Sequence, residues 1–336
     1  MLKSAPCKRF SNKKHRVNQY LFVILRWYFC FQFSNVFKLV QPHGETLNWK
    51  HRKRTELFYR LNNNRMTKAK KVLFITQEIT PYVPESSMST VGRNLPQFIQ
   101  EKGAEIRTFM PRWGIINERR NQLHEVIRLS GMNIVIDDTD HPLIIKVASI
   151  QAARMQVYFI DNDDYFHKRS MIADENGVEY SDNIERAIFY ARGVLETVKK
   201  LRWVPDVIHC QGWISAIAPM LIKTAFADDT PFVDTKIIFD AYEQMPQMTP
   251  PANIKDCLYF RNIDTALLDS TGIDFTQPDA LGKLAVYFSD GLVVEHADSN
   301  RELVAYAKER GIVVNTREKE ASLDVYSETY SAVIGE

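Results

Sequence analysis

The sequence has few of the features that mark a self-contained chemical site. Its four cysteines are scattered and form no CxxC pair, which argues against a disulfide framework and against a zinc site. It contains no glycine-rich phosphate loop, no GxSxG nucleophile turn and no HExxH metal motif. Scattered thiols suit a reducing compartment, so we expect a cytoplasmic protein. Any catalytic chemistry must rest on residues that lie far apart in the chain.

A long uninterrupted apolar run is also missing. The most apolar stretch, residues 20–40, contains Arg26, Gln32, Asn35 and Lys38. Each charge at the centre of a bilayer costs about 2.5–3.5 kcal/mol, so we expect no membrane span. A cleaved signal peptide is disfavoured as well, because the charged stretch before this run is long and no small-residue cleavage site follows it promptly.

The net charge of +2 on 336 residues hides two different compositions. Of the 43 basic and 41 acidic residues, residues 1–65 hold 14 and 2, which leaves 29 and 39 for the remainder. An acidic body lacks the positive surface that phosphate binding needs, so we expect no nucleic-acid partner. Residues 66–71 look like a natural chain start. We therefore expect residues 1–65 to be a basic leader that is either disordered or upstream of the true initiator.

Residues 66–314 alternate between strand-like and helix-like patterns. A short apolar strand at residues 71–78 runs into a proline-rich turn, a helix at 91–103 follows, and 105–111 reads as a second strand. This β-α-β order predicts an α/β fold with a doubly wound parallel sheet. The end of the first strand should then lie at the ligand-binding edge. Short strand-like runs between residues 125 and 160 predict a small β-meander inserted in the sheet.

The pattern continues toward the C-terminus and then fades. A capping box at residues 182–185 opens a long helix, and buried strands follow at 205–209 and 236–240. After residue 312 the apolar periodicity weakens, and we predict a polar tail over residues 315–336. The domain is therefore expected to occupy residues 66–314.

Four groups of polar, aromatic and proline residues follow the predicted strands or open the predicted helices. They are Glu78 with Pro81, Tyr82, Leu95 and Pro96; 159–162 with Tyr165, Phe166 and Arg169; Gly177 with 180–183 and Arg186; and 205–209 with Trp213 and Pro219. In their order and intervals these groups resemble the N-terminal catalytic domain of bacterial glycogen synthases and plant starch synthases. The resemblance covers about residues 70–314.

This resemblance implies one Rossmann-like half of a GT-B glycosyltransferase. It implies transfer of glucose from ADP-glucose to the non-reducing end of an α-1,4-glucan, with retention of configuration; UDP-glucose is left open as the donor. No metal cofactor is expected, because cations and helix N-termini can neutralise the diphosphate leaving group. A glucan presents hydroxyls and apolar ring faces, so a cleft lined by aromatic and carboxylate side chains can bind it.

The resemblance also points to substrate-binding positions at the strand ends. They are Glu78, Tyr82, Asp161, Asn162, His209, Gln211 and Trp213. His209 would orient or hydrogen-bond a sugar hydroxyl, and Gln211 would donate to one. Trp213 would pack either on a sugar ring or in the core, and a purely structural role for His209 stays open. We identify no catalytic nucleophile.

The chain departs from the family pattern at several of these positions. The K-[TV]-G-G-L motif corresponds to Pro-Glu-Ser-Ser-Met at residues 84–88, which lacks a cation and two glycines. The H-x-H-D-W motif has become His-Cys-Gln-Gly-Trp at residues 209–213, and T-I-H-N has become Phe-Asp-Ala-Tyr at 239–242. Several groups that would touch the donor are therefore absent.

In the family, a second Rossmann-like half binds the donor through an Arg/Lys pair and a Glu. The sequence contains no segment that resembles this half. We expect an incomplete transferase whose donor-binding domain is lost or supplied by a separate domain or subunit. Two alternatives stay open: a non-catalytic glucan-binding or regulatory module, and a structural partner subunit without a sugar site.

Overall fold

The computed structural model describes residues 70–335 apart from 244–245, 248–249, 297 and 318–322. The chain divides into two compact units, Met1–Arg65 and Met66–Glu336, and all described residues belong to the second. The expectations for the basic leader lie outside the described residues. Among the helices of the described part, none is long and apolar enough to cross a bilayer.

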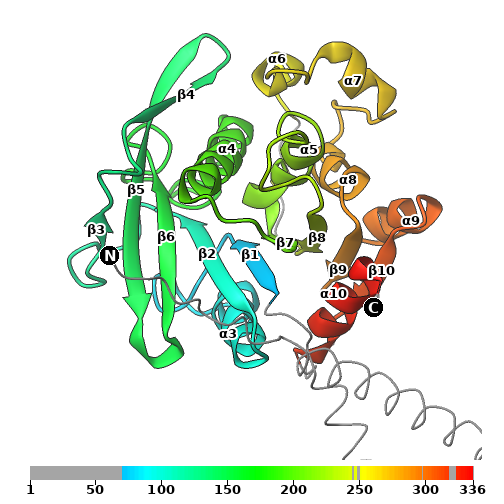
Figure 1. The fold of residues 1–336 in the computed structure, drawn as a ribbon. Helices are drawn as coiled ribbons and strands as arrows, with labels where there is room; N and C mark the ends of the chain where they lie inside the picture. Colours follow the sequence, from blue (N-terminus) through cyan, green and yellow to red (C-terminus); the bar gives the residue numbers. More distant parts are fainter. Residues whose placement is uncertain (1–69, 244–245, 248–249, 297, 318–322, 336) are drawn as a thin grey trace, which may run out of the picture. The chain divides into compact units, whose positions relative to one another are not determined.

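The described unit is built on one mostly parallel sheet (Figure 1). Its strand order is β10-β9-β8-β7-β1-β2-β6-β5-β3, and β4 pairs with β5. The strands are β1 (Lys71–Ile75), β2 (Glu105–Pro111), β3 (His124–Glu125), β4 (Met132–Ile136), β5 (Thr139–Ile150), β6 (Met155–Asp161), β7 (Val207–Gln211), β8 (Lys236–Ala241), β9 (Gly291–Val294) and β10 (Val313–Thr316). Strands β3 to β5 pair antiparallel, and β5 joins them to β6, so they form the predicted meander at one edge.

The first strand, β1, lies at the centre of the parallel part of the sheet. It pairs with β7 on one side and with β2 on the other. Residues 72–75 are all buried, as expected for a strand whose two faces are both covered by helices. The apolar run that opens the domain is therefore the middle of its core.

Helices cover both faces of the sheet (Figure 1). On one face lie α4 (Asn183–Leu201), α5 (Ala218–Lys223), α8 (Ala280–Tyr287) and α9 (Arg301–Glu309). On the other face lie α3 (Ser87–Glu101) and α10 (Asp324–Ile334), which enclose a second apolar cluster with residues of β1, β7, β8 and β9. Two short helices, α6 (Ile254–Leu258) and α7 (Thr265–Ser270), follow β8.

The segment predicted as a polar tail, residues 315–336, contains the end of β10 and the helix α10. Tyr326, Thr329, Tyr330 and Val333 form a buried stripe at helical spacing, and this stripe packs on the sheet. Two tyrosines and a threonine supply most of that stripe, so hydrophobicity alone does not reveal it. The tail is thus part of the packed unit.

The turn after β1 leads into α3 through a reciprocal cap. The Ser86 hydroxyl accepts a hydrogen bond from the backbone N–H of Ser89 at 2.9 Å, and the Ser89 hydroxyl accepts one from the backbone N–H of Ser86 at 2.8 Å. Within the helix, Gly92 allows α3 to approach the end of β1. A Cβ at this position would lie 2.0 Å from the carbonyl oxygen of Glu78.

Gly92→Ala is expected to lower the free energy of unfolding by about 1–3 kcal/mol, because the added methyl must push α3 away from the backbone at Glu78. Alanine normally favours a helix by about 1 kcal/mol over glycine, so the sign of the effect tests the close approach. Urea denaturation measures it, with Gln97→Ala on the same helix as the control. Equal or greater stability for Gly92→Ala would show that the helix can shift freely.

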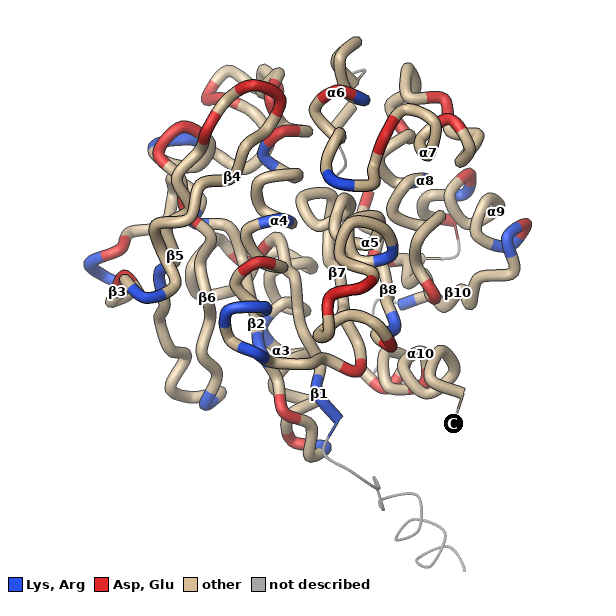
Figure 2. Tube along the Cα trace, turned by 45° about the horizontal axis from the view of Figure 1, so that its top comes forward, with Lys and Arg blue, Asp and Glu red and all other residues tan. Residues whose placement is uncertain are grey.

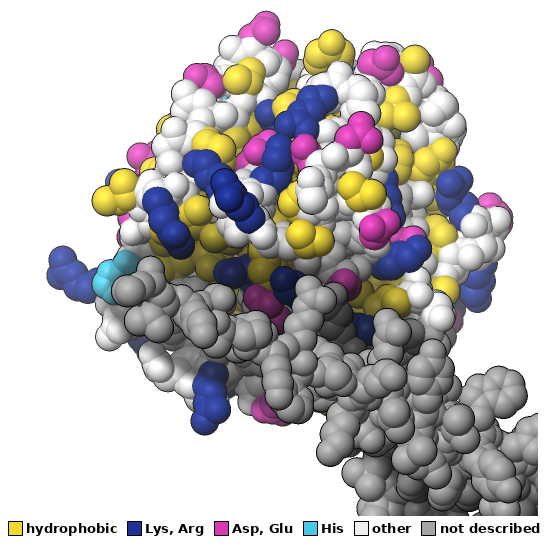
Figure 3. All heavy atoms as spheres, viewed as in Figure 1, with side chains coloured by type: hydrophobic (Ala, Val, Ile, Leu, Met, Phe, Trp, Pro, Cys, Tyr) yellow, Lys and Arg dark blue, Asp and Glu magenta, His cyan; other side chains and the backbone are white. Residues whose placement is uncertain are grey.

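Acidic and basic residues are both present in the helices and loops around the sheet (Figure 2). On the face shown in Figure 3, Lys and Arg side chains stand among acidic and apolar side chains and form no continuous basic area in the described part.

Candidate functional site

The structure buries every side chain that the sequence singles out as substrate-binding. The seven are at most 6% exposed. Glu78, His209 and Gln211 follow or belong to the neighbouring strands β1 and β7, whose register pairs Phe74 with His209. Tyr82, Asp161 and Asn162 lie nearer β6. The predicted residues therefore do not form one cluster, and burial decides what each can do.

Gln211 and Glu78 connect the sheet to the beginning of α3. The Gln211 amide donates to the carbonyl oxygen of Met88 at 3.1 Å and to the Tyr242 hydroxyl at 3.0 Å. The Glu78 carboxylate accepts a hydrogen bond from the Ser86 hydroxyl at 2.7 Å. Both side chains thus fix the helix whose N-terminus faces the edge of the sheet, and they act on that edge through α3.

His209 is enclosed by aromatic rings. The ring centroids of Phe74, Tyr326 and Tyr330 lie 5.7, 5.4 and 5.9 Å from that of the imidazole. Neither ring nitrogen has a hydrogen-bond partner among the described residues, and Nε2 lies 3.5 Å from an oxygen of Asp240. The helix α10 covers this side chain, so it does not reach a ligand at the surface.

Asn162 and Asp161 stabilise the fold around β6. Asn162 Oδ1 accepts hydrogen bonds from the backbone N–H groups of Asp164 and Tyr165, which closes the turn after β6. Asp161 pairs with Lys146 at 2.8 Å. Burial opposes ionisation of Lys146, but the carboxylates of Asp161 and Glu118 raise its pKa above the usual range.

Tyr82 and Trp213 belong to the apolar interior. Tyr82 packs edge-on against Phe159 with ring centroids 4.9 Å apart, and burial raises the pKa of its hydroxyl to about 12. Trp213 is fully buried, with its ring centroid 6.5 Å from that of Trp113. In this structure its ring packs in the core.

A buried polar network that sequence reasoning missed joins β8 to the segment after β10. Arg317 Nη1 lies 3.2 Å from both oxygens of Asp240 and donates to the hydroxyls of Tyr242 and Tyr326, each at 2.6 Å. The Tyr326 hydroxyl donates to Asp240 at 2.9 Å. Burial disfavours the charged guanidinium, but Asp240 and the two phenols raise the pKa of Arg317 above its ordinary value.

One sequence signal could have pointed to this network. Asp240 ends a buried strand, and a buried carboxylate requires a cation or several donors. The sequence does not say which of the distant arginines supplies it, because that choice depends on the path of the chain after β10.

A cavity of about 570 Å³ opens beside the N-terminus of α3, at the carboxyl ends of β9 and β10. We call it the α3 cavity. Its polar lining includes Glu85, Ser87, Glu295, His296 and Arg317, and Arg317 is the sole Lys or Arg among the described residues that line it. The carboxyl ends of parallel strands are where α/β sheets hold ligands, so this cavity is the candidate functional site.

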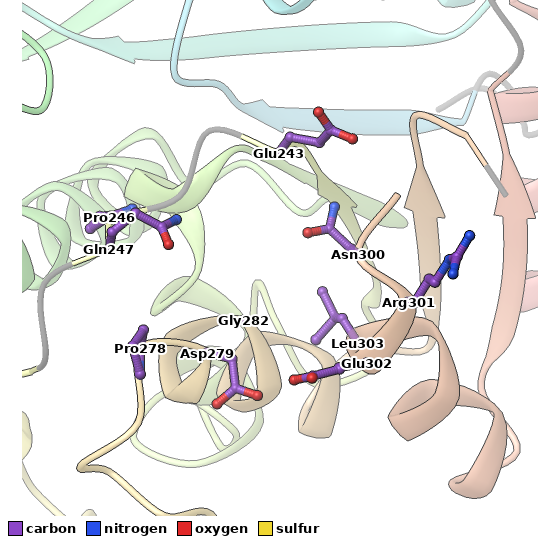
Figure 4. A pocket seen from close by; sticks show the side chains of 10 residues that line it. All are labelled: Glu243, Pro246, Gln247, Pro278, Asp279, Gly282, Asn300, Arg301, Glu302 and Leu303. Atoms are coloured by element: carbon purple, nitrogen blue, oxygen red, sulfur yellow. The ribbon is translucent and has the colours of Figure 1, made fainter. Parts of the chain in front are cut away.

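A smaller cavity of about 270 Å³ lies between the end of β8 and the beginnings of α8 and α9. Glu243, Asp279 and Glu302 stand around it, together with Asn300, which directly precedes α9 (Figure 4). None of the seven residues predicted from the sequence lines this cavity or the α3 cavity. Among the described residues, no group of three or more His, Cys, Asp or Glu is placed to hold a metal ion.

Comparisons with known proteins agree on one family. The sequence model described as the starch synthase catalytic domain matches residues 71–312. The glycogen synthase of Chlorobium limicola is 32% identical over 236 residues, which cover 68% of this chain and 48% of the relative. The glycogen synthase of Chlorobaculum tepidum is 37% identical over 169 residues, which cover 50% of this chain and 35% of the relative.

A solved structure has the same fold. The catalytic domain of starch synthase IV from Arabidopsis thaliana, bound to ADP and acarbose, superposes with a TM-score of 0.58 at 15% identity, over 75% of this chain and 52% of that one. This confirms the predicted fold class, a Rossmann-like half of a GT-B fold. The chain spans about half the length of the relatives it matches.

Proposed function

Because this chain belongs to the starch synthase catalytic domain family, we propose that it is the acceptor-side half of a glucosyltransferase that extends an α-1,4-glucan with glucose from ADP-glucose. The observation that carries the proposal is the family match over residues 71–312. The position of the α3 cavity supports it, since the cavity lies at the sheet edge that holds ligands in such folds.

The lining of the α3 cavity suits the acceptor better than the donor. Carboxylates such as Glu85 and Glu295 accept hydrogen bonds from sugar hydroxyls, and Ser87 and Asn94 add groups that both donate and accept. The turn at residues 84–88 lacks the lysine that in the family would face the diphosphate. We therefore expect the cations that stabilise the leaving group to lie outside the matched residues 71–312.

We propose that a separate domain or subunit supplies this donor-binding half, in a cytoplasmic protein. Losing one electrostatic donor for a developing charge lowers the rate of a reaction by about 10²–10³-fold. The purified chain alone is therefore expected to transfer glucose at least about 10²-fold more slowly than the same chain captured from its own cells with its associated polypeptides. Incorporation of radiolabelled ADP-glucose into glycogen measures both rates.

Acceptor binding is tested separately, by isothermal titration of the purified chain with maltoheptaose. We expect saturable heat at millimolar ligand and none with cellobiose, the β-1,4-linked control. Two results together would overturn the proposed function: no heat with maltoheptaose, and no labelled glycogen above a boiled control from the captured protein.

A further inference from the structure

Arg317 reaches the α3 cavity with one hydrogen-bond donor unused. Its side chain is deeply buried, at 7% exposure, and Nη1 is held by Asp240, Tyr242 and Tyr326. Nη2 has no hydrogen-bond partner among the described residues, although the guanidinium lines the cavity. A buried donor without a partner is costly, so a ligand group that accepts this hydrogen bond is favoured.

Glu295 stands beside that donor as an acceptor. Its Oε1 lies 3.7 Å from Arg317 Nη2, which is too long for a direct hydrogen bond. The same oxygen accepts a hydrogen bond from the Ser87 hydroxyl at 2.8 Å, which holds the carboxylate next to the N-terminus of α3. One oxygen atom can lie within hydrogen-bond distance of both Nη2 and Oε1, provided that it accepts from the first and donates to the second.

The kind of group that fits this gap follows from its hydrogen-bonding. A hydroxyl both donates and accepts, whereas an ionised phosphate oxygen only accepts and would be repelled by the Glu295 carboxylate. The surrounding charge acts in the same direction. Asp240 compensates Arg317 from behind, so the carboxylates of Glu85 and Glu295 make the described residues that line the cavity negative in total. This negative charge disfavours the binding of a diphosphate and has little effect on the binding of a neutral sugar.

We propose that the α3 cavity is a binding subsite for a neutral sugar, in which one hydroxyl is held between Arg317 and Glu295, and that it rejects phosphate groups. The proposal rests on the proposed function, since a glucan is the sugar that this half would hold. It also gives residues 84–88 a role. In place of a cation and two glycines, the turn supplies Glu85 and the serine that positions Glu295, which changes the class of ligand at this edge from phosphate to hydroxyl.

The test compares maltotriose with ADP on the full chain by isothermal titration. We expect the wild type to bind maltotriose more tightly than ADP. Glu295→Gln keeps the size of the side chain but removes its charge, and should weaken maltotriose binding about 10-fold, the effect of losing a hydrogen bond to a charged group. Glu309→Gln, on the exposed far end of α9, is the matched control and should leave both affinities unchanged.

A second variant tests the rejection of phosphate. Glu85→Lys combined with Glu295→Gln reverses the charge of the cavity lining and should bind ADP at least about 10-fold more tightly than the wild type. Unchanged maltotriose affinity in Glu295→Gln, or tighter binding of ADP than of maltotriose by the wild type, would overturn the subsite while leaving the proposed function intact. Absence of any maltooligosaccharide binding by the wild type would overturn the subsite and would also count against the proposed function.

Discussion

Replacing Asp240 by alanine should lower the free energy of unfolding by about 3–5 kcal/mol, because it leaves the buried guanidinium of Arg317 without its counter-charge. Asp240 is fully buried and Arg317 nearly so, so water cannot replace the lost carboxylate. The Tyr326 hydroxyl also loses its acceptor. Urea denaturation followed by far-UV circular dichroism measures the change.

Two further variants test whether the unpaired charge of Arg317 causes this loss of stability. Asp240→Ala combined with Arg317→Met removes both charges and should be more stable than Asp240→Ala alone, because no unpaired ion is left in the interior. Asp298→Ala breaks an ion pair with Arg301 whose side chains are both largely exposed, and should change stability by less than about 1 kcal/mol. A double variant less stable than the single one would show that Arg317 is not held chiefly by Asp240.

The central strands could be predicted from sequence because each is a short apolar run bounded by turn residues. Residues 72–75 and 207–208 are buried on both faces of the sheet, so their pattern does not depend on which helix covers them. The helix α4 does begin directly after Asp182, but the predicted capping box is not formed: the Asp182 side chain makes no capping hydrogen bond and pairs with Arg169 instead. The apolar runs are local signals, so these strands could be found without knowing which helices cover the sheet.

The covering of the sheet by α10 could not be predicted in the same way. Its buried stripe contains tyrosines and a threonine, which occur on surfaces as often as in cores. Whether they face water or the sheet depends on the uncovered area beside α3, which is set by elements far away in the chain. The prediction of a polar tail at residues 315–336 was therefore wrong. Because Arg317 lies in this segment, its role in the buried network was missed as well.

The same cause limits what the sequence says about the site. His209 stands at the end of a strand in a family motif, which favours a ligand contact, yet Tyr326 and Tyr330 enclose it. Asp161 is likewise buried, and its carboxylate forms an ion pair with Lys146. A motif identifies which strand end a residue occupies, but access to that residue depends on neighbours contributed by other segments. The α3 cavity combines a turn near residue 85 with residues 295 and 317, and no spacing rule connects them.

Tyr326→Ala is expected to lower the free energy of unfolding by about 3–5 kcal/mol, as truncating a large buried aromatic side chain does. The loss combines a cavity against His209 with the removal of the hydroxyl that joins Arg317 to Asp240. Because the guanidinium then loses one of its three fixed partners, sugar binding at the α3 cavity should weaken as well. Urea denaturation measures the first effect, and titration with maltotriose at a temperature where the variant is folded measures the second.

Tyr330, one helical turn further along α10, is the matched control. Its ring also packs against His209, but its buried hydroxyl has no hydrogen-bond partner among the described residues. Tyr330→Phe should therefore be neutral or slightly stabilising, whereas Tyr326→Phe should cost about 1.5–3 kcal/mol, the range for hydrogen bonds to charged groups. Equal effects of the two phenylalanine variants would mean that α10 acts by packing alone. A larger cost for Tyr326→Phe, accompanied by weaker maltotriose binding, would show that the C-terminal helix positions Arg317 at the edge of the sugar subsite.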